Sequence, residues 1–142
     1  MRLSGISFLL TFMLWFSAHG QVKEEIDSLT VLLGKSIHDT TRIQANLRLA
    51  HIYLKQKNIS GADDLVNECF SLVDKSSLDA PADLYWTRAD IFFNKRDMQA
   101  ALDDMDIVTD MLSTKGDNES MAKAQNFIGM IYHYWGQFSQ SK

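Results

Sequence analysis

The chain has 142 residues, of which 46% are hydrophobic and 23% charged, so it suits a single globular domain and is too apolar for a disordered protein. A formal net charge of −4 and a pI near 5.4 argue against general binding to nucleic acid. Cys69 is the single cysteine, which excludes an intrachain disulfide and a metal site built on several cysteines.

The first twenty residues have the pattern of a secretory signal peptide. A basic start at Arg2 is followed by an apolar run over residues 6–16, and Ala18 and Gly20 place small residues before a cleavage site at Gln21. The apolar run is shorter than the roughly 20 residues that span a bilayer. We therefore predict that residues 1–20 are removed and that residues 21–142 are exported, to the periplasm or outside the cell.

The next stretch predicts an opening helix over residues 22–36, with a linker to residue 40. Apolar residues recur there at helical spacing on one face, at Val22, Ile26, Leu29 and Leu33. A helix capped within residues 39–41 is then expected to run to about residue 56. After a turn at 57–60, with Ser60 as the expected cap, a partner helix carries Ala62, Val66 and Cys69 on one face.

Two further segments repeat this helix–turn–helix pattern. The second begins after Asp79-Ala80-Pro81, turns at residues 95–97 and ends near Gly116. The third is expected to be capped at Asp117-Asn118 and to turn at Gly136-Gln137, with Phe138 filling the corner.

The small residues of these segments keep one period. Ala50, Ala89 and Gly129 are 39 and 40 residues apart, and Ala62, Ala101 and Ser141 show the same spacings. Two helices approach closely only where a side chain is very small, so these positions predict helix crossings. Because two sets of small residues recur at the same spacing, the sequence indicates a repeat.

The residues around these crossings resemble the tetratricopeptide repeat, or TPR. The best match is Gln125-x-x-Ile128-Gly129-x-x-Tyr132, and weaker versions surround Ala50 and Ala89. Arg88 departs from the pattern because it stands where the family has an apolar residue. The resemblance implies an all-α fold, a right-handed α-solenoid of about two and a half hairpins after the opening helix: 43–78, 82–116 and a truncated 122–142.

The period exceeds the family's usual length of about 34 residues. This longer variety looks like the exported N-terminal regions of bacterial sensor kinases and membrane-tethered transcription regulators. The resemblance implies a non-catalytic scaffold that binds a protein or peptide, or alternatively the sensory input region of a signalling protein. The reading frame downstream of this sequence distinguishes the scaffold from the sensory region. Attachment to a membrane is expected only through sequence beyond this chain.

The resemblance also implies where a partner would bind. In this family, ligands commonly lie in the concave groove lined by the first helix of each repeat, which here implies Leu47, His51, Lys55, Trp86, Asp90, Asn94, Asn126, Met130 and His133. Trp86 is the expected anchor because a large ring buries much area at small entropy cost. The alternative is that Trp86 packs between neighbouring hairpins.

No pattern of reactive residues indicates an enzyme, a cofactor or a metal. The four histidines lack metal-ligand spacing, and Asp103, Asp106 and Asp110 fall on one outer helical face rather than in a calcium loop. Cys69 is expected to be a small buried residue because no neighbouring base is evident.

The third repeat is expected to lack its second helix. Ile128, Tyr132 and Trp135 would then have no helix to pack on, and exposing each large apolar side chain forfeits roughly 1.5–3 kcal/mol. We therefore expect the chain to be a fragment or to be completed by a partner, and on its own to fray from about Ala122 or to self-associate.

Overall fold

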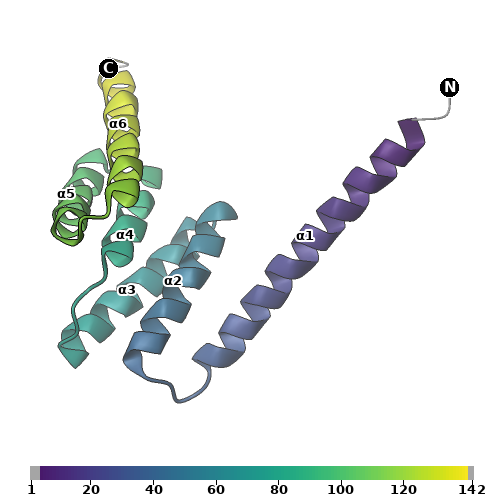
Figure 1. Cartoon of the computed structure of the whole chain (residues 1–142), viewed down its shortest axis with the longest axis horizontal. Helices are drawn as coiled ribbons and strands as arrows, with labels where there is room; N and C mark the ends of the chain where they lie inside the picture. Colours follow the sequence, from purple (N-terminus) through teal and green to yellow (C-terminus); the bar gives the residue numbers. More distant parts are fainter. Residues whose placement is uncertain (1–3, 141–142) are drawn as a thin grey trace.

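The computed structural model describes residues 4–140, with the surroundings of side chains for residues 19–137. Within residues 4–140 the chain is all-helical, as predicted, and contains no strand. The six helices are α1 (Ser4–Leu33), α2 (Asp39–Lys55), α3 (Ile59–Ser76), α4 (Ala82–Asn94), α5 (Met98–Lys115) and α6 (Asn118–Gln140). Figure 1 shows α2 with α3 and α4 with α5 as neighbouring pairs, while α6 packs on α5 and α1 leans away.

Within each pair, α2–α3 and α4–α5, the two helices are joined by a turn of the same construction. Lys57 and Arg96 adopt left-handed backbone conformations, with φ of 61° and 65°. The amide of the next residue in each turn, Asn58 or Asp97, donates to the carbonyl five residues earlier, at 2.8 and 2.9 Å. This geometry closes the end of the first helix and reverses the chain within a few residues.

The same two turn residues also begin the second helix of each pair. The Asn58 side chain accepts from the Gly61 amide at 3.0 Å, and the Asp97 side chain accepts from Ala100 at 3.1 Å. The prediction of Ser60 as the cap was therefore wrong, because Asn58 precedes it at the position whose oxygen reaches the third amide.

The expected cap of α2 within residues 39–41 was also wrong, whereas that of α6 is confirmed. The N-cap residue of α2 is His38, whose side chain makes no capping bond, and Asp39 instead accepts a hydrogen bond from Ser76. α4 starts after Pro81 without a side-chain cap. At the start of α6 the Asp117 side chain accepts from Ser120 at 3.0 Å.

The predicted turn at Gly136-Gln137 is absent, because α6 runs through both residues to Gln140. Glycine weakens a helix by about 1 kcal/mol relative to alanine but does not force it to end. Gly136 is exposed and has the helical conformation on both sides. The expected corner role of Phe138 and the crossing role of Ser141 lie outside the described side chains.

The alanines at the predicted crossings are fully buried. Ala50 and Ala62 lie in a core cluster formed mainly by α2 and α3, and Ala89 and Ala101 lie in a second cluster formed by α4, α5 and α6. Gly129 differs, since it is exposed and a Cβ added there would meet nothing within 4 Å. Tyr132, one turn later, is 59% exposed. The face of α6 that corresponds to the crossing surface of α2 and α4 is therefore open.

Arg88 compensates for its departure from the apolar pattern by pairing with a buried carboxylate. Its guanidinium donates two hydrogen bonds to Asp104 of α5, at 2.7 and 2.6 Å, and Asp104 is only 3% exposed. The same guanidinium lies 4.0 Å from the centre of the Phe70 ring of α3. One side chain of α4 thus connects its partner helix to the preceding pair.

α1 is longer than the predicted opening helix. It is continuous from Ser4 to Leu33 and passes without a break through residue 21, where cleavage is predicted. Figure 1 shows its first half standing clear of the other helices. None of the helices within the described residues is both long enough and apolar enough to span a bilayer.

The buried ion pair predicts the effect of two substitutions. Arg88→Met alone leaves the Asp104 carboxylate buried without a counter-charge, and we expect a loss of about 3 kcal/mol in the free energy of unfolding. The double variant Arg88→Met/Asp104→Leu removes both charges and is expected to recover most of that loss. Urea denaturation followed by circular dichroism measures both values. Lys123→Met, which breaks an exposed pair with Glu119, is the control and should leave the free energy of unfolding almost unchanged.

Substitution by leucine at two of the predicted crossing positions, Ala89 and Gly129, is expected to have opposite effects on stability. Ala89→Leu overfills a closed crossing and is expected to destabilise the chain by about 1–3 kcal/mol. Gly129→Leu places the same side chain in open space and replaces a poor helix former, so stability should rise by a few tenths to about 1 kcal/mol. Urea denaturation of a monomeric sample compares the two. A destabilising Gly129→Leu would mean that the α6 face is covered in solution.

Candidate binding groove

Two adjoining hollows that share lining residues lie between α2 and α4. Each hollow has a volume of about 450–480 Å³, and His51 and Asp83 line both. We call the two together the binding groove. The acidic hollow is lined by His51, Ala82, Asp83, Trp86, Thr87, Asp90, Leu112 and Ser120. The apolar hollow is lined by Thr40, Ile43, Gln44, Leu47, Arg48, His51, Leu78, Asp79, Pro81 and Asp83.

One face of α4 supplies most of the acidic hollow. Asp83, Trp86 and Asp90 stand three and four residues apart, which places them on one side of a helix. Leu112 from the end of α5 and Ser120 from the start of α6 also line this hollow. The Trp86 ring stacks on Phe127 of α6, with ring centres 6.4 Å apart. The hollow therefore depends on the packing of α4 against α6.

The apolar hollow is formed by α2 and by the segment that connects α3 to α4. Ile43 and Leu47 come from α2, and Leu78 and Pro81 come from the connection. The only guanidinium in its lining, that of Arg48, is paired with Glu25 of α1. The charge of Arg48 is thus already balanced, and the walls are mainly apolar.

His51 connects the two hollows and the two helices. Its Nε2 lies 2.9 Å from the hydroxyl oxygen of Thr87 and 3.5 Å from a carboxylate oxygen of Asp83. The Thr87 hydroxyl donates its own proton to the Asp83 carbonyl oxygen at 2.7 Å. The Thr87 oxygen must therefore accept from His51, which fixes the imidazole with its proton on Nε2.

Thr87, His51 and Asp83 do not have the geometry of a nucleophile–base–acid triad. In such a triad the nucleophile and the carboxylate bond to different nitrogens of the histidine. Here Thr87 and Asp83 both lie at Nε2, and Thr87 is 2% exposed. The arrangement instead holds α2 against α4 and positions Asp83 at the rim of the groove.

The groove shifts the ionisation of two of its residues. The pKa of His51 is raised above 6.5, chiefly by its hydrogen bond to Asp83, although burial opposes the shift. The pKa of Asp90 is raised above 3.8 because burial disfavours its carboxylate. The positive charge of Lys57 and a hydrogen bond from Asn94 offset only part of that penalty.

The nine residues expected to line a partner groove divide into three sets. Leu47, His51, Trp86 and Asp90 line the binding groove. Asn94 is adjacent and donates to Asp90 at 3.0 Å, and Lys55 borders a separate hollow between α1 and α2. The remaining three lie on exposed positions of α6 that line neither hollow: Asn126, Met130 and His133.

Sequence reasoning missed Asp83, Thr87 and the walls from the α3–α4 connection. Asp83 could have been found, because it lies one helical turn before Trp86 on the same face. Thr87 and Pro81 gave no comparable signal, since their roles depend on the approach of α4 to α2.

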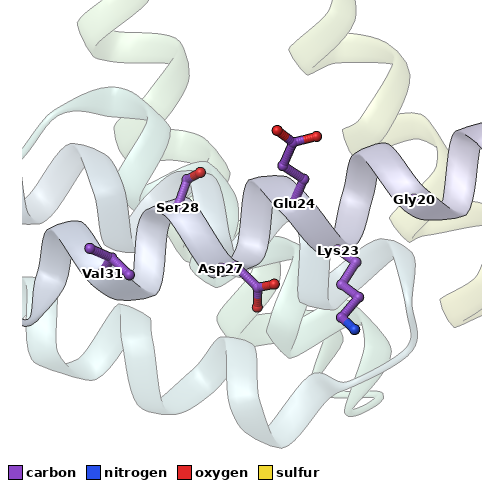
Figure 2. A pocket seen from close by; sticks show the side chains of 6 residues that line it. All are labelled: Gly20, Lys23, Glu24, Asp27, Ser28 and Val31. Atoms are coloured by element: carbon purple, nitrogen blue, oxygen red, sulfur yellow. The ribbon is translucent and has the colours of Figure 1, made fainter.

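Two other hollows lie along α1. The one in Figure 2 has a volume of about 530 Å³ and is lined by six residues of α1 alone. Figure 2 shows Lys23 and Asp27 pointing to one side of the helix and Glu24 and Ser28 to the other. A surface made by a single helix encloses no ligand, so this hollow is not a candidate site. Within the described residues, no group of three or more histidine, cysteine or acidic side chains could hold a metal ion.

Cys69 is fully buried, as expected for a small core residue. Burial raises the pKa of its thiol from 9.0 to about 11, so the thiolate is strongly disfavoured. Its Sγ lies 3.7 Å from the Ile43 carbonyl oxygen.

No family model, no curated protein and no solved structure matches the chain. The resemblance to TPR proteins therefore stays a prediction that rests on the residues themselves.

The geometry of His51 predicts how stability depends on pH. Because the folded-state pKa of His51 is raised above the ordinary value of 6.5, its contribution is fully present below pH 6.5 and is lost as the pH rises through the raised pKa. The contribution is expected to be below about 1 kcal/mol, since the side chain is partly exposed.

NMR titration of the His51 ring measures this pKa directly. Asp83→Asn should lower it because the charged partner is removed, and His51→Gln should remove this part of the pH dependence from urea denaturation. A His51 pKa at or below 6.5 in the unmodified chain would contradict the assigned geometry.

Proposed function

We propose that the chain is a non-catalytic, exported interaction module that binds a protein or peptide segment in the binding groove. In this proposal α2–α3 and α4–α5 are TPR-like hairpins of a right-handed solenoid, and α6 is the first helix of a third. The groove is then the concave surface on which the first helices of successive hairpins lie.

The observation that carries this proposal is that the two hollows adjoin. They share His51 and Asp83, which form their common boundary, and both side chains are partly exposed, so a bound chain can pass over this pair and reach both hollows. Their volumes of about 480 and 450 Å³ are each large enough for one or more side chains. Two such hollows side by side suit a linear segment of protein that places a side chain in each.

The chemistry around His51 supports a binding role over a catalytic one. Thr87, the hydroxyl nearest to His51, is buried and its proton is committed to a backbone carbonyl. The thiol of Cys69 is buried and disfavoured as a thiolate. Neither nucleophile is both accessible and paired with a base, which catalysis by such a group requires.

Filling the groove tests this proposal. Peptides selected from a displayed random library against the immobilised full chain should bind with micromolar affinity. Ala82→Trp places an indole in the acidic hollow, which Ala82 lines, and should weaken binding by at least about tenfold by isothermal titration calorimetry. Ser71→Trp introduces the same ring at an exposed position of α3 and should leave the affinity unchanged. Equal affinity for both variants would place the binding surface elsewhere.

A further inference from the structure

We infer that the binding groove selects a peptide with a lysine or arginine side chain in the acidic hollow and an apolar side chain, two residues away, in the apolar hollow. This inference rests on the proposed function and specifies its ligand. The occupant is an extended segment of a partner protein, recognised by one cationic and one apolar side chain.

The acidic hollow is suited to a cation by its shape and its lining together. Asp83 and Asp90 place two carboxylates on the same face of α4, seven residues apart, and Trp86 lies between them on that face. No lysine or arginine lines this hollow. An ammonium or guanidinium group there can pair with a carboxylate and also lie against an indole, the aromatic ring that attracts cations most strongly.

The charged groups around the hollow leave this preference intact. From the end of α2, Lys55 acts on His51 and Lys57 acts on Asp90, but neither lines the hollow. From α6, Lys123 is paired with Glu119. His51 lines the hollow and carries a positive charge below its raised pKa, so the preference for a cation is expected to be strongest above that pKa.

The burial of Asp90 gives a cationic ligand a specific advantage. Its carboxylate is desolvated without a full counter-charge in the free protein, which raises its pKa. A ligand cation supplies the missing charge and stabilises the ionised carboxylate. Asp90 therefore gains more from a cationic ligand than from an uncharged ligand of the same shape.

The lining of the apolar hollow determines that the second recognised side chain of the peptide is apolar. Ile43, Leu47, Leu78 and Pro81 supply the apolar surface of the hollow. Asp79 and the shared Asp83 are among its polar lining residues, and Arg48 is already paired with Glu25. Alternate side chains of an extended peptide lie on the same side, roughly 6–7 Å apart. Because the hollows adjoin at His51 and Asp83, one peptide can fill both with residues i and i+2.

A defined peptide library tests the inference on the full chain. The probes are N-acetylated, C-amidated octapeptide mixtures with leucine fixed at one position and lysine, arginine, norleucine or glutamate fixed two positions away, on either side. Norleucine keeps the aliphatic stem of lysine and removes its charge. Fluorescence polarisation should show the lysine and arginine mixtures binding at least about tenfold more tightly than the norleucine mixture, with the glutamate mixture weakest.

Matched variants assign the preference to the acidic hollow. Asp83→Asn/Asp90→Asn should bring lysine and norleucine affinities within about twofold of each other, because both carboxylates are lost. Asp103→Asn/Asp106→Asn removes two exposed carboxylates of α5 and should leave the preference intact.

The outcomes separate this inference from the proposed function. Equal binding of the lysine and norleucine mixtures to the unmodified chain overturns the inference while leaving peptide binding in place. Failure of every mixture to bind overturns the inference, and failure of the peptides selected from the random library as well overturns the proposed function. The comparison of mixtures uses the unmodified protein, so it does not depend on the folding of any variant.

Discussion

The close crossing of paired helices at small side chains is the constraint on which the rest of the structure depends. Ala50 and Ala62 are fully buried in one core cluster, and Ala89 and Ala101 in the other. Larger residues at these positions would separate the helices and open the core between them. The crossings and the repeated left-handed turns at Lys57 and Arg96 fix each pair, and the contact between α2 and α4 then creates the groove.

The Arg88–Asp104 pair shows how a polar residue can occupy a core position of such a pair. A lone arginine facing α5 would be costly, but the bidentate bond to a nearly buried carboxylate satisfies it. The Phe70 ring under the guanidinium extends the contact to α3. This network aligns α4 with the preceding pair, and it thereby influences the face of α4 that carries Asp83, Trp86 and Asp90.

Much of the fold could be predicted from the sequence, because helical periodicity and the spacing of small residues are local signals. Local sequence rules failed where a segment permits more than one local structure. Asn58 rather than Ser60 caps α3, and α6 continues through Gly136 instead of turning there. In the groove, the resemblance to the TPR pattern pointed to Leu47, His51, Trp86 and Asp90, since each lies on the first helix of a predicted repeat. It could not identify Thr87 or Pro81, whose importance comes from the approach of α4 to α2. Asn126, Met130 and His133 were placed in the groove by analogy between repeats, but the packing of Phe127 on Trp86 leaves all three outside it.

The most direct test of the account is where a bound peptide contacts the protein. Amide chemical shifts of the ¹⁵N-labelled chain, recorded while a selected peptide is added, report this position residue by residue. The account predicts that the largest changes fall within residues 43–51 of α2 and residues 82–90 of α4. Changes centred on the exposed face of α6 around Tyr132, or on the outer faces of α3 and α5, would contradict it.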